Sequence, residues 1–300
     1  MKRAVSISLG SSKRNKAVEI TLLGEKVSLE RIGTDGSEAR AHQMYLELDG
    51  QVEAFGVGGI DLGVHTPWRF YPLHAAQRLV RGVTKTPYVD GQGLKETLER
   101  RVMQFVEQKI GADLQPKTAF VVQGISRYGM MESFVEAGYQ CVFGDLMSGL
   151  DIPIPIRSVA GLNRVAKLIL PIVGYLPFSM LYPTGEAQDK VTPKYEEYYR
   201  NNTVSAGDFL YVKQHMPETG MQGKTIVTNT TTEADVQFLK ARGIKYLVTT
   251  TPVLEGRSFG TNMMEAALVA VAGKGRALTH AEIEELIARL KLEPTIQKIN

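Results

Sequence analysis

Hydrophobic and polar residues alternate along the first part of the chain, and this pattern predicts strands. The alternating segments are AVSISLG (4–10), AVEITLLG (17–24), KVSLERIG (26–33) and VEAFGVGG (52–59). Gly24 and Glu25 join the second and third segments, so these two should form a hairpin. Between the last two, SEARAHQMYLEL has helical spacing and begins with Ser37, a residue suited to an N-cap. Strands and a helix together predict an α/β domain.

A helical period follows in residues 92–111, where apolar residues recur at the separation expected for one helix face. These residues are Leu94, Leu98, Val102, Phe105 and Val106. Glu99 and its charged neighbours are expected mostly on a solvated face. The helix should end near Gly111, and Pro116 opens the next segment. We therefore place the domain boundary at 112/113.

The second half has the pattern of a parallel sheet. Residues 119–145 read as an apolar strand, a glycine turn, a helix and a second strand that ends on an acid. TVSAGDFLYV (203–212), KTIVTN (224–229) and KYLVTTT (245–251) are further predicted strands, and a helix between the last two completes a second βαβ unit. The fold class predicted is α/β, with an N-terminal α/β substrate domain (1–112) and a Rossmann-type parallel-sheet domain (113–275). A C-terminal helix segment (276–300) with a capping box at Thr279 and Glu282 should dock on the body.

Composition and charge exclude several classes of protein. The net charge of +3 comes without a long run of lysine or arginine, which argues against nucleic acid as a partner. A single cysteine, Cys141, fits a reducing compartment, so a cytoplasmic protein is expected. The most apolar stretch, 165–182, is interrupted by Lys167, Pro171 and Pro177. It predicts a buried helix with a kinked exit, or a lid, and no membrane span.

Metal ligands are not predicted, because the five histidines form no close pair in the sequence. These histidines are His42, His65, His74, His215 and His280. His65 and His74 are expected to be structural.

The glycine turn in the first βαβ unit carries the main functional signal. Gly124, Ser126 and Gly129 occupy the three glycine positions of G-x-G-x-x-G, with serine at the middle one. Asp145 follows Gly124 by about 20 residues, the separation expected of an acid that binds a ribose. The spacing predicts a dinucleotide site. The alternative is a plain βαβ crossover, in which the glycines only turn the chain and Asp145 caps the next helix.

The identity of the nucleotide depends on two side chains. Asp145 would accept hydrogen bonds from ribose hydroxyls and repel a 2′-phosphate, which favours NAD. Arg127 could bind either the pyrophosphate or a 2′-phosphate, so NADP stays open as the cofactor. Thr228 and Asn229 follow a predicted strand at its carboxyl end and complete the expected cofactor-binding residues.

A known family resembles this chain at the segment VDGQGLKETLER (89–100). Asp90, Gly91 and Gly93 match the N-T-D-G-x-G motif of the shikimate and quinate dehydrogenases, whose next domain binds the cofactor. GTNMMEAALVA (260–270) is a weaker match to a second motif of that family, and LGSSKRN (9–15) is loosely similar to a third. The resemblance implies a two-domain NAD(P)-dependent quinate/shikimate 5-dehydrogenase-like enzyme.

The resemblance also implies roles for particular residues. Asp90 and a lysine would remove the proton from an alicyclic secondary alcohol while its hydride passes to the nicotinamide. The chain has no lysine between Lys26 and Lys85, so Lys85 and Lys95 are the candidates. The substrate would be a small anionic hydroxy acid, and a homodimer is compatible with the sequence. The candidate substrate-binding residues are Ser11, Ser12, Lys13 and Asn262.

Three alternatives stay open. Asp90 could be an ordinary turn or N-cap aspartate. The protein could bind a nucleotide as a sensor or regulatory module without redox turnover. It could also be a small-molecule phosphotransferase that holds phosphate at Ser11, Ser12 and Lys13, although a Walker-type motif is missing.

Overall fold

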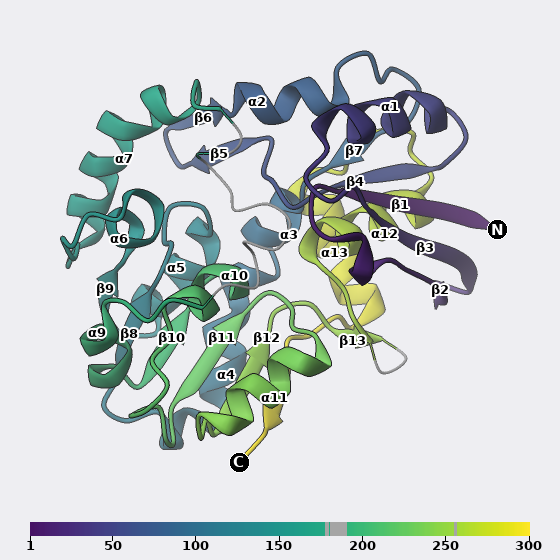
Figure 1. Ribbon diagram of the computed structural model, residues 1–300. Coiled ribbons are helices and arrows are strands. Elements are labelled where there is room, and N and C mark those ends of the chain that lie inside the picture. The colour runs from purple at the N-terminus through teal and green to yellow at the C-terminus, as the bar shows by residue number, and fades with distance from the viewer. Residues whose placement is uncertain (178–179, 181–190, 255–256) are drawn as a thin grey trace. The chain divides into compact units, whose positions relative to one another are not determined.

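The computed structural model describes residues 1–177, 180, 191–254 and 257–300. Packing divides the chain into two compact units (Figure 1). Unit 1 comprises 1–94, 169–188 and 254–292, and unit 2 comprises 95–168, 189–253 and 293–300. Both units are α/β, as the hydrophobic pattern predicts. Among the described residues, no helix is both long enough and apolar enough to cross a membrane.

Unit 1 is built on a five-stranded sheet with the order β2-β3-β1-β4-β7. Its strands are β1 (Lys2–Ser8), β2 (Lys16–Leu22), β3 (Glu25–Gly33), β4 (Ala54–Gly58) and β7 (Tyr88–Val89). The predicted hairpin is confirmed, because β2 and β3 pair antiparallel on either side of Leu23 and Gly24, which both have positive φ. The other neighbouring strands are parallel.

Helices of unit 1 cover this sheet and supply its core. Helix α1 (Glu38–Leu48) begins at the predicted N-cap, Ser37, whose side chain accepts a hydrogen bond from the Arg40 N–H. The fully buried Tyr45 on α1 donates its hydroxyl to the carbonyl groups of Ile7 and Gly56, which ties the helix to β1 and β4. Helix α12 (Thr261–Ala272) packs on the same two strands and is buried over most of its length.

The remaining elements of unit 1 are short, apart from α13. They are η1 (Ser12–Arg14), the hairpin β5 (Gly63–Thr66) and β6 (Arg69–Pro72), α2 (His74–Gln77), η2 (Arg78–Val80), α3 (Gln92–Glu96), β14 (Arg257–Ser258) and α13 (His280–Leu290). Helix α3 extends into the first residues of unit 2, and β14 pairs with β13 (Val253–Leu254) at the other boundary. The capping box at Thr279 and Glu282 is present as predicted.

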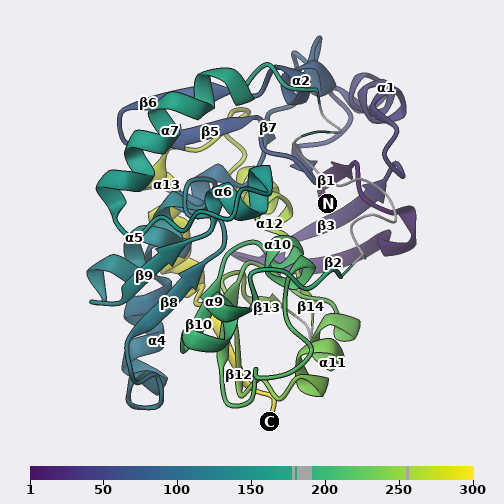
Figure 2. The same ribbon diagram turned by 60° about the vertical axis from the view of Figure 1, so that its left-hand side comes forward.

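Unit 2 contains a six-stranded sheet with the order β15-β12-β11-β10-β8-β9 (Figures 1 and 2). The strands are β8 (Thr118–Val121), β9 (Gln140–Phe143), β10 (Val204–Ala206), β11 (Thr225–Thr228), β12 (Tyr246–Thr249) and β15 (Thr295–Lys298). Strands β8 to β12 are parallel to their neighbours, and β15 is antiparallel to β12. The predicted parallel sheet is confirmed, and the edge strand β15 is an addition to it.

Helices lie on both faces of the unit 2 sheet, with α4 (Val102–Ile110) and α11 (Glu233–Ala241) on opposite sides (Figures 1 and 2). Helix α5 (Tyr128–Glu136) packs against α4. The shorter elements are η3 (Glu99–Arg101), η4 (Gly111–Asp113), α6 (Asp145–Leu150), α9 (Glu196–Asn201) and α10 (Phe209–Gln214). This two-faced covering explains why the strands of unit 2 read as apolar runs.

Several predicted boundaries differ from the structure. The long helix expected over 92–111 is divided into α3, η3 and α4, and the segment 203–212 forms the short strand β10 followed by α10. Unit 1 takes in α12 and α13, which the sequence divided between the second domain and a separate terminal segment. Helix α12 belongs there because its buried face packs on β1 and β4.

The apolar stretch 165–182 corresponds mainly to helix α7 (Val159–Val173), which includes Pro171. Leu162, Ala166 and Leu170 are buried, but Leu168 and Ile172 are exposed over 74% and 67% of their surfaces. The helix is therefore only half-buried. Residues 178–179 and 181–182 of the stretch lie outside the described residues.

Candidate functional site

The strand order of unit 2 defines a place where a ligand is expected. The five parallel strands lie across the sheet in the order β9-β8-β10-β11-β12, which is 2-1-3-4-5 when they are numbered along the chain. The chain therefore moves from β8 to one side of the sheet for β9 and to the other side for β10, and the switch point lies between β8 and β10. In open parallel sheets, ligands bind outside the carboxyl ends of the strands at such a switch point. Val121, Ala206, Val227 and Val248 are in register, so the loops that follow these strands begin at one level.

Five polar residues meet at this edge, and we call them the switch-point cluster: Glu99, Arg127, Asp208, Asn229 and Thr250. Arg127 donates from Nη1 to Glu99 Oε1 at 2.5 Å and from Nη2 to Asp208 Oδ2 at 2.6 Å. Asn229 Nδ2 donates to the same Asp208 oxygen at 2.9 Å. The Thr250 hydroxyl donates to Glu99 Oε1 at 3.2 Å. Loops after four different strands and the η3 turn thus converge on one network.

Burial makes this network unusual. The side chains of Arg127 and Glu99 are only 4% and 1% exposed, whereas Asp208 is 29% exposed. Burial by itself would raise the pKa of Asp208, but the charge and hydrogen bond of Arg127 hold that pKa below its ordinary value. The Leu210 N–H and the charge of Lys95 act in the same direction. Asp208 is therefore an ionised carboxylate with part of its surface accessible.

One oxygen of the cluster has no partner within the part of the chain that the structure describes. Glu99 Oε2 is buried and forms no hydrogen bond there, although Glu99 Oε1 accepts two. An unsatisfied carboxylate oxygen in a protein interior costs free energy and calls for a donor. An enclosed water molecule would supply that donor, because the oxygen itself is not accessible to solvent.

Partly exposed polar groups also follow the strand ends at this edge of the sheet. Gln123 and Ser126 follow β8, and the Ser126 hydroxyl donates to Gln123 Oε1 at 3.3 Å. Thr230, at the end of β11, is also partly exposed. These groups provide both donors and acceptors in loops at the same sheet edge as Asp208.

The amides of the glycine turn bind a side chain of the protein, and not the pyrophosphate that the spacing suggested. The N–H groups of Gly124 and Ile125 donate to the carboxylate of Asp145 at 3.0 and 2.8 Å. Asp145 opens helix α6, as in the plain crossover that the sequence left open. Two amides that would face a pyrophosphate therefore already bind an acid of the protein itself. Gly129 is needed for packing, because a Cβ there would come within 2.2 Å of the Lys95 carbonyl oxygen.

Asp145 should make stability depend on pH. Burial raises its pKa to about 6, although the Ile125 and Gly124 N–H groups oppose the shift. Because the folded protein binds this proton more tightly than the unfolded chain, the stabilisation is complete below about pH 4 and is lost as the pH rises through about 6. We expect the free energy of unfolding to fall by about 2–3 kcal/mol over this interval, measured by urea denaturation.

Asp145→Asn is the matched control for this pH dependence. The pKa values of Asp208 and Asp235 lie below the ordinary 3.8, so their effects fall at lower pH. The variant should flatten the change in stability between pH 4 and 7. An unchanged slope in the variant would contradict the assignment to Asp145.

The remaining predicted cofactor residues lie at the same edge. Asn229 belongs to the switch-point cluster, and the Thr228 hydroxyl donates to Asn229 Oδ1 at 3.1 Å. The structure thus brings together Arg127, Thr228 and Asn229, three of the residues chosen from the sequence. The roles of these residues in holding NAD stay predictions.

Glu99 and Asp208 are central to the cluster, although neither is among the residues to which the sequence assigns a binding or catalytic role. Asp208 follows the strand β10 directly, which is the signal that also identified Asn229. Glu99 precedes Val102 by three residues and Val106 by seven, so helical spacing puts it on the buried face. Glu99 is the buried exception in a charged run that was expected to lie mostly on a solvated face.

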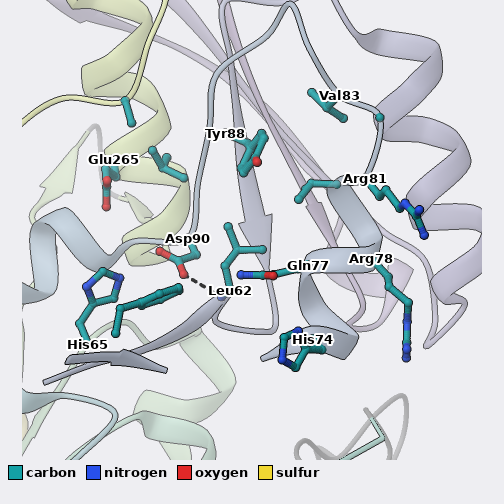
Figure 3. A pocket seen from close by; sticks show the side chains of 15 residues that line it. Leu62, His65, His74, Gln77, Arg78, Arg81, Val83, Tyr88, Asp90 and Glu265 are labelled. Atoms are coloured by element: carbon teal, nitrogen blue, oxygen red, sulfur yellow. Dashed lines mark hydrogen bonds between the residues drawn. The ribbon is translucent and has the colours of Figure 1, made fainter. Parts of the chain in front are cut away.

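Asp90 lies in unit 1 and lines a pocket of about 820 Å³ (Figure 3). Its Oδ2 accepts a hydrogen bond from the Leu62 N–H at 2.7 Å, and its Oδ1 accepts one from the Gln92 N–H at 3.1 Å. Gly91 has φ +98°, and a Cβ there would come within 2.8 Å of the Asn262 nitrogen. Asp90 and Asn262 are therefore close, and Asn262 Nδ2 donates to the Ser6 hydroxyl at 2.7 Å.

The two candidate lysines are placed differently. Lys85 is exposed, does not line the Asp90 pocket, and its backbone N–H donates to Asp49. Lys95 is 3% exposed and belongs to unit 2, where its charge affects Asp208. The structure does not bring Lys85 to Asp90, and each candidate's catalytic role stays a prediction.

The turn at Ser11, Ser12 and Lys13 forms η1. Ser11 Oγ accepts a hydrogen bond from the Lys13 N–H, and the Ser12 N–H donates to Asp35 Oδ1 at 2.7 Å. Asp35 therefore takes one amide that a substrate carboxylate or phosphate would use. Arg31 is also directed here, since it donates to the Ser11 carbonyl oxygen and to the Ser8 hydroxyl.

Two family models match the chain. The model described as "Domain of unknown function (DUF8754)" matches residues 93–299, and the model described as "Domain of unknown function (DUF8753)" matches residues 3–90. A search of curated proteins found no match.

Some solved structures that match the chain over most of its length have descriptions that name a sugar. A galactofuranose binding protein is 10% identical, with a TM-score of 0.36, and the match covers 100% of this chain and 95% of that chain. A protein from Mycobacterium smegmatis in complex with β-D-fucofuranose is 14% identical, with a TM-score of 0.35 and coverage of 99% and 99%. A sugar ABC transport system substrate-binding protein from Bordetella parapertussis 12822 is 12% identical, with a TM-score of 0.33 and coverage of 91% and 80%.

These findings correct the resemblance to the shikimate and quinate dehydrogenases. The family models that match the chain are described as domains of unknown function and not as that family. The assignment as an NAD(P)-dependent oxidoreductase is therefore wrong, and the sensor and phosphotransferase alternatives gain no support. The physical reason is that a D-G-x-G turn and a spaced glycine turn serve packing in many α/β proteins. Here Asp145 satisfies the amides of the glycine turn.

Proposed function

This chain belongs to the DUF8754 family, and we propose that it binds a small, neutral, polyhydroxylated ligand of the sugar class at the switch-point cluster of unit 2, without converting it. The observation that carries this proposal is the Asp208 carboxylate, which is 29% exposed at the switch point and is kept ionised by the buried Arg127.

Charge balance favours a neutral ligand. The cations Arg127 and Lys95 accompany the carboxylates of Glu99 and Asp208, so the region carries no net charge. An anionic ligand would find no excess positive charge there to offset its desolvation. The small anionic hydroxy acid expected from the sequence is thus a poorer fit than an uncharged polyol.

Hydroxyl groups suit these side chains chemically. Each sugar hydroxyl can donate to a carboxylate such as Asp208 and accept from an amide or serine, such as Gln123 or Ser126. Hydrogen bonds to an ionised group are stronger than those between neutral groups. Several such bonds in one place would give a sugar both affinity and a fixed orientation.

Binding without conversion follows from the state of the acids. A general acid or base works best with a pKa near the working pH. Arg127 pairs with both Glu99 and Asp208 and keeps the pKa of Asp208 below its ordinary value. A carboxylate held in this way can accept hydrogen bonds but is poorly suited to donate a proton.

Calorimetric titration with matched sugars tests the proposal. The panel contains neutral hexoses and pentoses, in pyranose- and furanose-forming types, together with galacturonate and galactosamine. We expect at least one neutral sugar to bind, and the acid with the same ring to bind at least about tenfold more weakly. Absence of binding across the neutral panel, or a preference for the sugar acid, would contradict the proposal.

A further inference from the structure

The pocket in unit 1 has charges of opposite sign on opposite sides. Asp90 and Glu265 lie on one side, together with His65, whereas Arg78 and Arg81 lie on the other (Figure 3). All of these residues belong to unit 1. The volume of about 820 Å³ is within the range of about 300–1,000 Å³ typical of small-molecule sites.

The acidic side is rigidly constructed. Backbone N–H groups of Leu62 and Gln92 hold both oxygens of Asp90. Glu265, on the buried helix α12, is 4% exposed, and its Oε2 accepts a hydrogen bond from the Leu94 N–H. A Cβ at residue 93 would lie 2.8 Å from Glu265 Oε1, so Gly93 is what allows this close approach. Two carboxylates are thus fixed at one side of the pocket.

The basic side is formed by the turn after α2. Arg78 and Arg81 are exposed, and neither guanidinium group forms an ion pair with any residue in the described ranges. Leu62 and Val83 also line the pocket, and Figure 3 places Leu62 and Gln77 between the two charged sides. The lining therefore has an acidic side, a mixed middle and a basic side.

We propose that this pocket is a second binding site, for a small zwitterion whose ammonium and carboxylate groups are separated by an apolar chain, as in an ω-amino acid. The ammonium group pairs with Asp90 and Glu265, and the carboxylate pairs with Arg78 and Arg81. We expect an α-amino acid, whose ammonium and carboxylate groups are attached to one carbon, to pair with one side only. This site is independent of sugar binding in unit 2.

The test is a titration of the full chain with glycine, 4-aminobutanoate, 6-aminohexanoate and 8-aminooctanoate, in which NMR chemical shifts report binding. Affinity should pass through a maximum as the chain lengthens, with glycine weakest. At the best length, the compounds that lack the amino group or the carboxylate should bind about tenfold more weakly. Equal affinity for all of them, or no binding by any ω-amino acid, would overturn the proposal.

Variants test the acidic and the basic side of the pocket separately. Arg78→Gln with Arg81→Gln, both at exposed positions, should weaken the zwitterion about threefold to tenfold and leave the alkylamine unchanged. Asp90→Asn should weaken the alkylamine and leave the alkylcarboxylate unchanged. Arg40→Gln, an exposed arginine elsewhere in unit 1, is the matched control and should change nothing. Equal losses for both half-ligands in the arginine variant would show a structural effect and reject the assignment.

Discussion

Replacing Arg127 by methionine is expected to lower the free energy of unfolding by about 3–5 kcal/mol. Arg127 is the cation between Glu99 and Asp208, and Glu99 is 1% exposed. Methionine fills much of the volume but leaves a buried carboxylate without its counter-charge, which is the costly way to break a buried ion pair. Urea denaturation at neutral pH measures the loss.

Two further variants make this result specific. Arg200→Met removes an exposed arginine paired with Glu196 and should cost no more than about 1 kcal/mol. Adding Glu99→Gln to Arg127→Met removes the uncompensated charge and should restore part of the stability. If Arg127→Met costs no more than Arg200→Met, the buried network does not have the energetic role assigned to it.

Asp208→Asn is expected to weaken binding of the best neutral sugar by at least about tenfold. The substitution removes the accessible negative charge of the cluster and turns one acceptor into a donor. Asparagine caps helices as well as aspartate does, so helix α10, which Asp208 caps through the Leu210 N–H, should be retained. Calorimetry with the sugar identified by the panel gives the measurement.

Asp151→Asn is the matched control for this substitution. Asp151 is also in unit 2 and pairs with Lys194 on the surface, so its loss should leave sugar affinity unchanged. Gln123→Ala, at a partly exposed position after β8, should weaken the sugar about threefold without touching the ion pairs. Full affinity in both Asp208→Asn and Gln123→Ala would exclude the switch-point cluster as the sugar site.

Local pattern predicted much of the secondary structure. The hairpin between β2 and β3, the caps Ser37 and Thr279, and the βαβ unit around α11 are present because each depends on residues close in sequence. The position of Asn229 at a strand end also follows from local pattern, since the carboxyl ends of parallel strands form one edge.

Long-range packing could not be predicted in the same way. The amides of a glycine turn can bind either a ligand or an acidic side chain of the protein. Here they bind Asp145, and the sequence spacing would be the same in both cases. In the sequence, Glu99 is one of several consecutive charged residues. Its burial is stabilised by hydrogen bonds from Arg127 and Thr250, which are distant from it in the sequence. The assignment of α12 to unit 1 depends on contacts with strands at the start of the chain.

Sugar binding at the switch-point cluster is tested most directly by an NMR titration of the isotopically labelled chain with the neutral sugar that binds best. We expect the largest amide shifts at the strand ends of unit 2, at Gln123, Ser126, Asp208 and Thr230. The amides around Asp90 in unit 1 should stay unchanged. Shifts confined to unit 1, or no shifts at saturating sugar, would contradict a ligand site at the switch point.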